Sequence, residues 1–141
     1  MIRKAVVDDF EEIHKICEMD LGYICDKELL KERLEALNPA RESVLAAVND
    51  GKVVGFIHVE RYDVLYAPSM CNVLGLAVAK DYRRRGFGKE LLFAAEEWAR
   101  ENGIFMMRLN SGMKRKEAHL FYRNNGYGSE KEQMRFIKEI Q

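Results

Sequence analysis

Three consecutive arginines and a Gly-Phe-Gly sequence stand just before an amphipathic segment, in the stretch DYRRRGFGKELLFAAEEWA that runs from Asp81 to Ala99. The first turn of a helix leaves backbone N–H groups without partners, and the helix dipole adds partial positive charge there. Gly86 and Gly88 let a ligand approach the backbone closely, because glycine has no Cβ. The pattern therefore predicts a site for phosphate or pyrophosphate. The basic side chains of the loop are those of Arg83, Arg84, Arg85 and Lys89.

Two other interpretations of this basic loop are a nucleic-acid patch and an ordinary solvated helix start. Lys+Arg and Asp+Glu both total 23, so the formal net charge is zero. A dedicated nucleic-acid-binding domain usually carries a marked basic excess, and the balance argues against nucleic acid as a partner. Two common phosphate motifs also fail. The G-x-x-x-x-G-K-[ST] loop lacks its first glycine and has Glu90 after Lys89, and the dinucleotide fingerprint G-x-G-x-x-G has Leu91 at its third glycine.

Composition places few further limits on function. The 141 residues are 48% hydrophobic and 33% charged, which is typical of a globular protein, and we expect one domain over residues 1–141. The three cysteines and three histidines lack the spacing of a disulfide framework or a zinc site, so we expect reduced thiols, no metal and a cytoplasmic protein. No apolar run reaches the roughly 20 residues that cross a bilayer, so we expect no membrane partner. The early acidic residues argue against a signal peptide.

Hydrophobic periodicity and turn residues predict alternating strands and helices that would position the loop. Strands are predicted over residues 1–7, in a hairpin over 43–65, and over 70–78, 104–110 and 132–140. Helices are predicted after Asp8 or Asp9, either of which could cap the first of them, and over residues 26–37, 88–102 and 116–125. The apolar runs 70–78 and 104–110 indicate buried strands. The order predicts an α/β domain with a mixed sheet.

The stretch LGLAVAKDYRRRGFGKELL resembles the acetyl-CoA-binding motif of the GNAT superfamily of N-acetyltransferases. In that motif a strand ending in L-x-V is followed by a short loop, and then by [Q/R]-x-x-G-x-[G/A] at the start of a helix. Arg83, Gly86 and Gly88 occupy the defining positions of the loop. Leu76 and Val78 match the end of the strand.

A second segment, EAHLFYRNNGY, resembles the family's A-x-x-x-Y-x-x-x-G-[F/Y] sequence, and IRKAVVDDFEEI resembles its usual beginning, so that the similarity covers essentially the whole chain. The resemblance implies an α/β fold with a mixed, mostly antiparallel, twisted sheet flanked by about four helices. Its central parallel strand pair would be splayed at the cofactor site. The residues in register with the second segment are Ala118, Tyr122, Gly126 and Tyr127.

The resemblance also implies acetyl-CoA as the cosubstrate. The backbone of the strand end would bind the pantetheine arm, and the acetyl carbonyl would point at a strand amide near Leu76. The N–H groups of the loop and first helical turn would hold the pyrophosphate, helped by the Arg83 side chain. The residues assigned to the cofactor in this way are Leu76, Ala77, Val78, Arg83, Arg84, Arg85, Gly86, Phe87, Gly88 and Lys89.

For the chemical step, the resemblance assigns Tyr122 as a proton or hydrogen-bond donor to the departing thiolate, and the alternative for this residue is a packed core aromatic. The sequence does not single out one general base. Glu60 is one candidate, Asp63 and His58 are others, and a water chain without a dedicated base is the alternative. Many relatives carry Asn seven residues before the catalytic tyrosine, where this chain has Arg115.

The acceptor implied by the resemblance is a primary amine, on a small molecule or on a peptide or protein, which attacks directly in a ternary complex. Acidic and aromatic residues in EMDLGYICDKELL and RYDVLYAPSM could form a pocket for a cationic amine, or could be ordinary surface residues. A homodimer is consistent with the family. The alternative function is a non-catalytic acetyl-CoA sensor. The residues of the predicted pocket are Asp20, Tyr23, Asp26, Tyr62, Asp63 and Tyr66.

Overall fold

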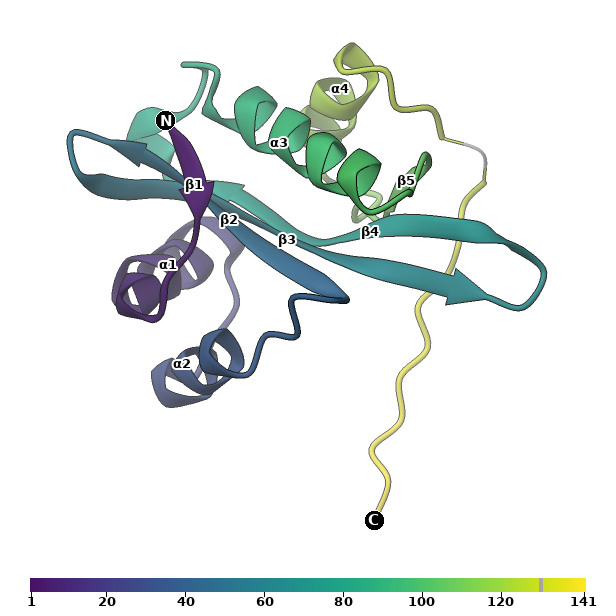
Figure 1. Cartoon of the computed structure of the whole chain (residues 1–141), viewed down its shortest axis with the longest axis horizontal. Coiled ribbons are helices and arrows are strands. Elements are labelled where there is room, and N and C mark those ends of the chain that lie inside the picture. Colours follow the sequence, from purple (N-terminus) through teal and green to yellow (C-terminus); the bar gives the residue numbers. More distant parts are fainter. Residues whose placement is uncertain (130) are drawn as a thin grey trace. The chain divides into compact units, whose positions relative to one another are not determined.

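One mixed sheet carries the strands that the structure describes, in the order β1-β2-β3-β4-β5 (Figure 1). The first four strands are antiparallel to their neighbours, and β5 is parallel to β4. This confirms the mixed, mostly antiparallel sheet predicted from the sequence. The strands are β1 (Ile2–Lys4), β2 (Glu42–Asn49), β3 (Lys52–Val64), β4 (Ala67–Val78) and β5 (Met107–Leu109).

The computed structural model describes residues 1–129 and 131–141, in two compact units, Met1–Asn110 and Ser111–Gln141. The first unit contains the sheet, with α1 (Phe10–Ile16) and α2 (Lys27–Glu35) on one face and α3 (Phe87–Glu101) on the other (Figure 1). The second unit contains α4 (Lys116–Asn124). The α-helices of the described chain therefore agree in number with the sequence prediction of about four.

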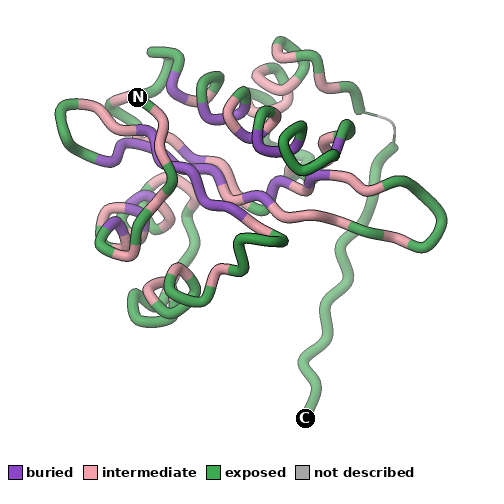
Figure 2. The backbone as a smooth tube through the Cα atoms, viewed as in Figure 1, coloured by how far each residue is buried: buried purple, intermediate pink, exposed green. Residues whose placement is uncertain are grey.

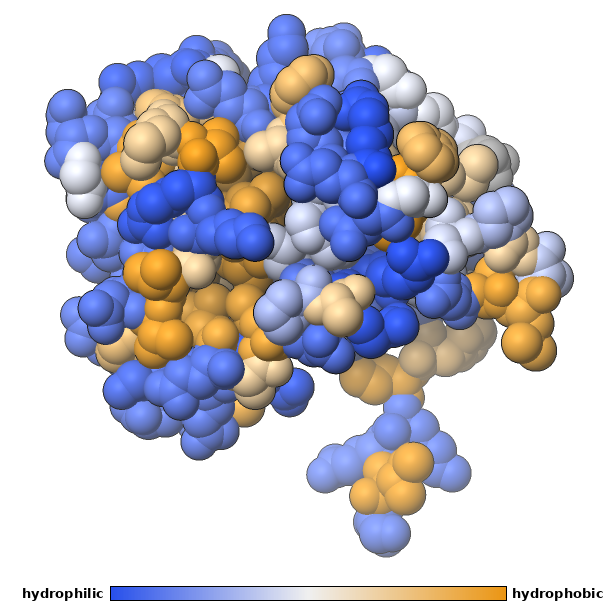
Figure 3. Space-filling view, viewed as in Figure 1, coloured by the Kyte–Doolittle hydropathy of each residue, from blue (hydrophilic) through white to orange (hydrophobic). Residues whose placement is uncertain are grey.

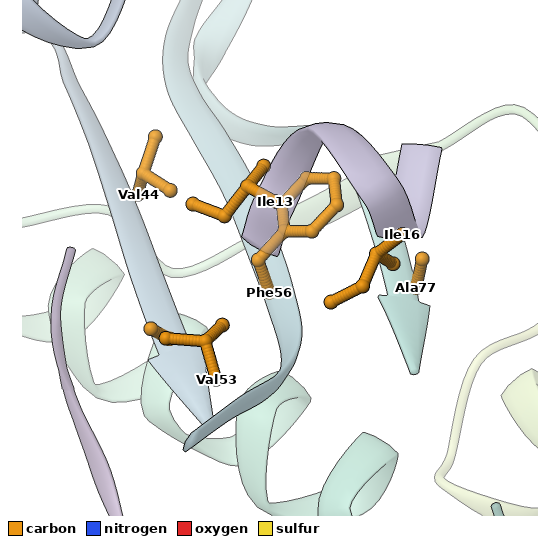
Figure 4. Close-up of a cluster of buried hydrophobic side chains, with 7 residues drawn as sticks. Ile13, Ile16, Val44, Val53, Phe56 and Ala77 are labelled. Atoms are coloured by element: carbon orange, nitrogen blue, oxygen red, sulfur yellow. The ribbon is translucent and has the colours of Figure 1, made fainter. Parts of the chain in front are cut away.

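The central parts of β2 and β3 are buried in continuous runs, because helices cover both faces of the sheet there (Figure 2). On the face of α1, the helix places Ile13 and Ile16 against Phe56 of β3 and Ala77 of β4 (Figure 4). On the opposite face, α3 buries one stripe, as its helical spacing predicts. The buried residues of α3 are Phe87, Leu91, Leu92, Ala95, Trp98 and Ala99.

Gly55 is the fourth residue of β3, where the backbone of β4 and a side chain of α3 approach it closely. A Cβ built there would lie 2.9 Å from the carbonyl oxygen of Ala77 and 3.2 Å from Cδ1 of Leu91. We expect Gly55→Ala to lower the free energy of unfolding by about 1–3 kcal/mol, because the strand or the helix must shift. Thermal or urea denaturation measures the loss. Gly75→Ala is the control, since its Cβ would meet only the ring of Phe56 at 3.7 Å, and an equal loss in both variants would contradict the prediction.

The predicted strand over residues 132–140 is wrong. Described residues 131–141 belong to no strand or helix and are exposed. A segment becomes a strand only when its N–H and C=O groups bond to a neighbouring strand, and the sheet ends at β5. Apolar residues of this segment are visible as orange atoms among polar ones at the C-terminal end in Figure 3. Those residues are Met134, Phe136, Ile137 and Ile140, each at least 79% exposed.

Two predicted strands are also less buried than their composition suggests. In the run 104–110, only Met107–Leu109 forms a strand, and Phe105 is 82% exposed. In β4, Leu74 is 49% exposed. Both residues lie where β4 and β5 are not paired, since the described pairs join only Cys71–Val73 to Met107–Leu109.

The predicted cap of the first helix is wrong as well. The carboxylate of Asp9 bonds to the backbone N–H of Val6, at 2.8 Å, and to the guanidinium of Arg3, at 2.8 and 3.0 Å, instead of to helix amides. The hydrogen bond from Arg3 lowers the pKa of this buried carboxyl below its ordinary value. Asp9 therefore joins the start of the helix to β1.

Candidate active site

The strands β4 and β5 separate in the middle of β4. Only three residue pairs join them, and the last is Val73 with Leu109. From that point β4 continues to Val78, paired with β3 on one side and with no strand of the described chain on the other. An irregularity opposite His58 and Val59 leaves Leu74 without a partner in the β3–β4 register, as in a β-bulge. One edge of β4 therefore presents free backbone groups to a ligand.

The loop after β4 connects the end of this unpaired strand edge directly to the start of α3. A short 3₁₀ turn, Lys80–Tyr82, is followed by two residues with positive φ, Arg84 at 62° and Gly86 at 90°. Gly86 precedes the first helical residue, Phe87, and no side chain caps the helix there. The first N–H groups of α3 have no intrahelical acceptor, so this turn has the features of an anion-binding site.

The basic side chains of the loop differ in what they contact. Arg83 donates from Nε to the carbonyl of Val78 at 3.0 Å and from Nη2 to Asp20 at 3.1 Å. The same oxygen of Asp20 accepts the backbone N–H of Lys80 at 3.0 Å. Arg83 is thus held by the segment after α1 through Nε and Nη2, and the predicted contact with a pyrophosphate falls to its Nη1.

The other cations of the loop are exposed. The guanidinium of Arg85 lies over the rings of Tyr82 and Phe87, at 5.2 and 5.8 Å from their centroids. Arg84 and Lys89 form no ion pair with the described residues. These two side chains are therefore available to an anion at the start of α3.

Glu60 is half-buried on β3, opposite Asn72 of β4. Its Oε2 accepts a hydrogen bond from the Asn72 amide at 2.9 Å, and it has no cationic partner in the described chain. The other candidate bases are engaged elsewhere. His58 lies 2.8 Å from a carboxylate oxygen of Glu42. Asp63 bonds to Ser69, and this bond lowers the pKa of Asp63 below its ordinary value, which makes it a weaker base.

Tyr122 lies on α4, in the second unit, and is packed against Phe121 and Tyr127 with ring centroids 5.3 and 6.0 Å away. Burial raises the pKa of Tyr122 above its ordinary value, and nearby Arg115 opposes this. The phenol is therefore protonated at neutral pH, as a proton donor must be. The ring contacts of Tyr122 are equally those of an aromatic side chain that only packs in the fold.

The three carboxylates predicted to line an acidic pocket for a cationic amine all have partners within the first unit. Asp20 holds Arg83, and Asp63 contacts Arg61 and Arg41. Asp26 caps α2 by accepting the backbone N–H of the second and third residues of that helix. Each carboxylate thus has a contact inside the fold.

Further findings bear on chemistry elsewhere in the described chain. The three cysteines are free, and burial raises the pKa of the Cys71 thiol to about 12. Among residues 1–129 and 131–141, no three His, Cys, Asp or Glu side chains lie close enough to hold a metal ion. No helix in these residues is both long and apolar enough to cross a membrane.

Three features together are typical of one class of protein: the separation of β4 from β5, the glycine turn before the uncapped α3, and the mixed sheet. Residues 1–127 match the Acetyltransferase (GNAT) family, and the chain belongs to that family. It is an N-acetyltransferase, in agreement with the resemblance found in its motifs.

The relatives include an aminoalkylphosphonate N-acetyltransferase of Salmonella typhimurium, 31% identical over 99% of this chain and 90% of its own. Two solved structures share the fold. An aminoglycoside acetyltransferase from an uncultured soil metagenomic sample is 22% identical, with a TM-score of 0.80 over 100% of this chain and 96% of its own. The aminoglycoside N-acetyltransferase AAC(6')-Iy in complex with CoA is 17% identical, with a TM-score of 0.81. The match covers 99% of this chain and 100% of that one.

Proposed function

We propose that this protein transfers the acetyl group of acetyl-CoA to the primary amine of a small molecule, by direct attack in a ternary complex. One observation carries the proposal: the unpaired edge of β4 runs into the uncapped N-terminus of α3. Extended backbone suits the amide-rich pantetheine arm, and helix amides suit a pyrophosphate. GNAT acetyltransferases use acetyl-CoA, and this arrangement fits that cosubstrate.

The roles of the chain's residues follow from their positions in the fold. The backbone of Leu76, Ala77 and Val78 would bind the pantetheine arm, and a strand amide near Leu76 would stabilise the charge that develops on the carbonyl oxygen. The N–H groups of residues 84–89 would bind the pyrophosphate, with Arg84 and Lys89 adding charge. These assignments are supported by the open strand edge and the free first turn of α3.

Atoms and protons balance in the proposed step as follows. The acceptor nitrogen forms a bond to the thioester carbonyl carbon, and the bond between that carbon and sulfur breaks. The nitrogen loses a proton to Glu60, directly or through water. The Tyr122 hydroxyl donates a hydrogen bond to the departing sulfur and passes its proton only late in the step, after which water returns a proton to Tyr122 and removes one from Glu60. Glu60 is the best placed of the candidate bases, because its carboxylate is not paired with a cation in the described chain.

The acceptor class is suggested by the relatives. The Salmonella protein is named for aminoalkylphosphonates and the metagenomic protein for aminoglycosides, and both are small molecules with amines. We further propose that residues 1–141 work as one acetyltransferase domain, since the family match runs across the boundary between the two units. A homodimer is compatible with this proposal, and analytical sedimentation would measure the oligomeric state.

The test is release of free thiol from acetyl-CoA by the purified protein with a panel of amines. We expect turnover with at least one small primary amine, and calorimetry should show acetyl-CoA binding at micromolar concentration. Binding without thiol release from any amine would instead support the sensor. Absence of acetyl-CoA binding would overturn the proposal.

A further inference from the structure

A row of polar side chains crosses the sheet next to the point where β4 and β5 separate. The strand register pairs Glu42 with Glu60, Glu60 with Asn72, and Asn72 with Arg108. Directly paired residues on neighbouring strands project to the same face of a sheet. This is also the face of Phe56 and α1, so the row continues the face beyond the apolar core. Neither Asn72 nor Arg108 was among the candidates predicted from the sequence.

The contacts within the row hold a carboxylate and a guanidinium apart. Asn72 donates to Glu60 at 2.9 Å and accepts from Nη1 of Arg108 at 2.8 Å, so its amide lies between the two charges. The guanidinium of Arg108 lies 4.4 Å from the centroid of the Tyr62 ring, which orients its plane. Nη1 makes the one hydrogen bond of this guanidinium within the described chain.

Within the described chain Glu60 and Arg108 have no ion-pair partner, whereas the nearby Glu42 and Arg61 have close partners. Glu42 lies beside His58 at 2.8 Å, and Arg61 lies 3.4 Å from Asp63. Arg108 has no carboxylate partner among the described residues, although both it and Glu60 are half-buried. Half-buried charges without counterions are costly, and a ligand with the complementary charges would compensate both.

The position of the row places it at the proposed reaction site. Asn72 and Arg108 form the next-to-last pair before β4 and β5 part, and the bulge at Leu74 follows two residues later on β4. The strands β3 and β5 are two strand spacings apart, or about 10 Å. Within that span Asn72 bonds to one carboxylate oxygen of Glu60 and to one guanidinium nitrogen of Arg108, which leaves the other oxygen of Glu60 and the remaining N–H groups of Arg108 for a ligand.

We infer that Arg108 is a specificity residue that binds an anionic group of the amine acceptor, while Glu60 takes the amine. The acceptor would then be a small zwitterion, with an ammonium group and a carboxylate or phosphonate a few bonds apart. This inference rests on the proposed function. A guanidinium with its remaining N–H groups unoccupied suits either anion, because it can donate two parallel hydrogen bonds.

The experiment compares wild type with Arg108→Gln, using 2-aminoethylphosphonate, β-alanine and n-propylamine as acceptors. Gln removes the charge and keeps a donor for Asn72. We expect KM for the preferred zwitterion to rise about 10–100-fold, with kcat little changed, because the charged hydrogen bonds to the anion are lost. The KM for n-propylamine and the affinity for acetyl-CoA should stay within about twofold. Arg108→Lys should recover part of the loss, and the two zwitterions separate a phosphonate from a carboxylate acceptor.

The control is Arg61→Gln, which removes another half-buried guanidinium of the same sheet, and which should leave the KM for all three amines unchanged. If wild type acetylates n-propylamine as well as the zwitterions, or if Arg108→Gln raises all KM values equally, the inference is wrong while the proposed function stands. If no amine is acetylated, the proposed function fails. In that case calorimetry tests the inference separately, by titrating 2-aminoethylphosphonate into the protein with CoA present. The inference requires that wild type binds 2-aminoethylphosphonate and that Arg108→Gln does not.

Discussion

The Gly86→Ala variant is expected to bind acetyl-CoA about 10–100-fold more weakly than wild type, as measured by calorimetry. Gly86 has φ of 90°, where a residue with a Cβ is strained. Relief of that strain must turn the backbone just before Phe87, and this displaces the amides proposed to hold the pyrophosphate. A Cβ at Gly86 would meet no atom of the described residues within 4 Å, so a clash with them does not explain the loss.

Gly51 provides a matched control for the strain. It lies at the turn between β2 and β3 with φ of 77°, and a Cβ there would also meet nothing within 4 Å. Gly51→Ala and Gly86→Ala should therefore lose similar stability, while only Gly86→Ala loses acetyl-CoA affinity. Equal affinity in the two variants would remove the turn before α3 from the proposed cofactor site.

Tyr122→Phe is expected to lower kcat about a hundredfold, because general acid catalysis contributes at least that much when a donor is well placed. Acetyl-CoA affinity should change little. A phenol with a pKa of about 10 and a thiol of about 8.5 make complete proton transfer uphill by ~2 kcal/mol, so the hydroxyl acts mainly as a hydrogen-bond donor while charge builds on sulfur. Stopped-flow or steady-state thiol release gives kcat, and Tyr127→Phe controls for the loss of a hydroxyl from the neighbouring ring.

The pH dependence gives a second measurement of the same residue. Because burial raises the pKa of Tyr122, its donor form persists through neutral pH and is lost only as the pH rises through that raised pKa. The wild-type kcat should decline on the alkaline side at a pH no lower than the ordinary ionisation of a phenol, near 10. Tyr122→Phe should lack this decline. An unchanged profile and kcat would leave Tyr122 with a packing role only.

Local patterns predicted the helices and the turn of the hairpin well. The amphipathic run predicted over residues 88–102 is α3, Phe87–Glu101, since apolar spacing and the following Asn-Gly are local signals. The hairpin turns where Asp50 and Gly51 take positive φ, as Asn-Asp-Gly indicates.

Features that depend on strand register were not predicted. The Glu60–Asn72–Arg108 row needs three strands in one alignment, and a bulge of one residue decides which side chains share a face. The one available signal was that Asn72 and Arg108 are polar exceptions in apolar runs. The strand predicted at residues 132–140 failed for the related reason that a local sequence pattern does not supply a neighbouring strand to pair with.

The bonds from Asp20 to Arg83 and to the backbone of Lys80 join residues sixty positions apart in the chain. They connect the segment between α1 and α2 to the turn proposed for the coenzyme. A substitution of Asp20 would therefore disturb the turn before α3 from outside the cofactor motif, because it removes an acceptor from both Arg83 and the backbone of Lys80.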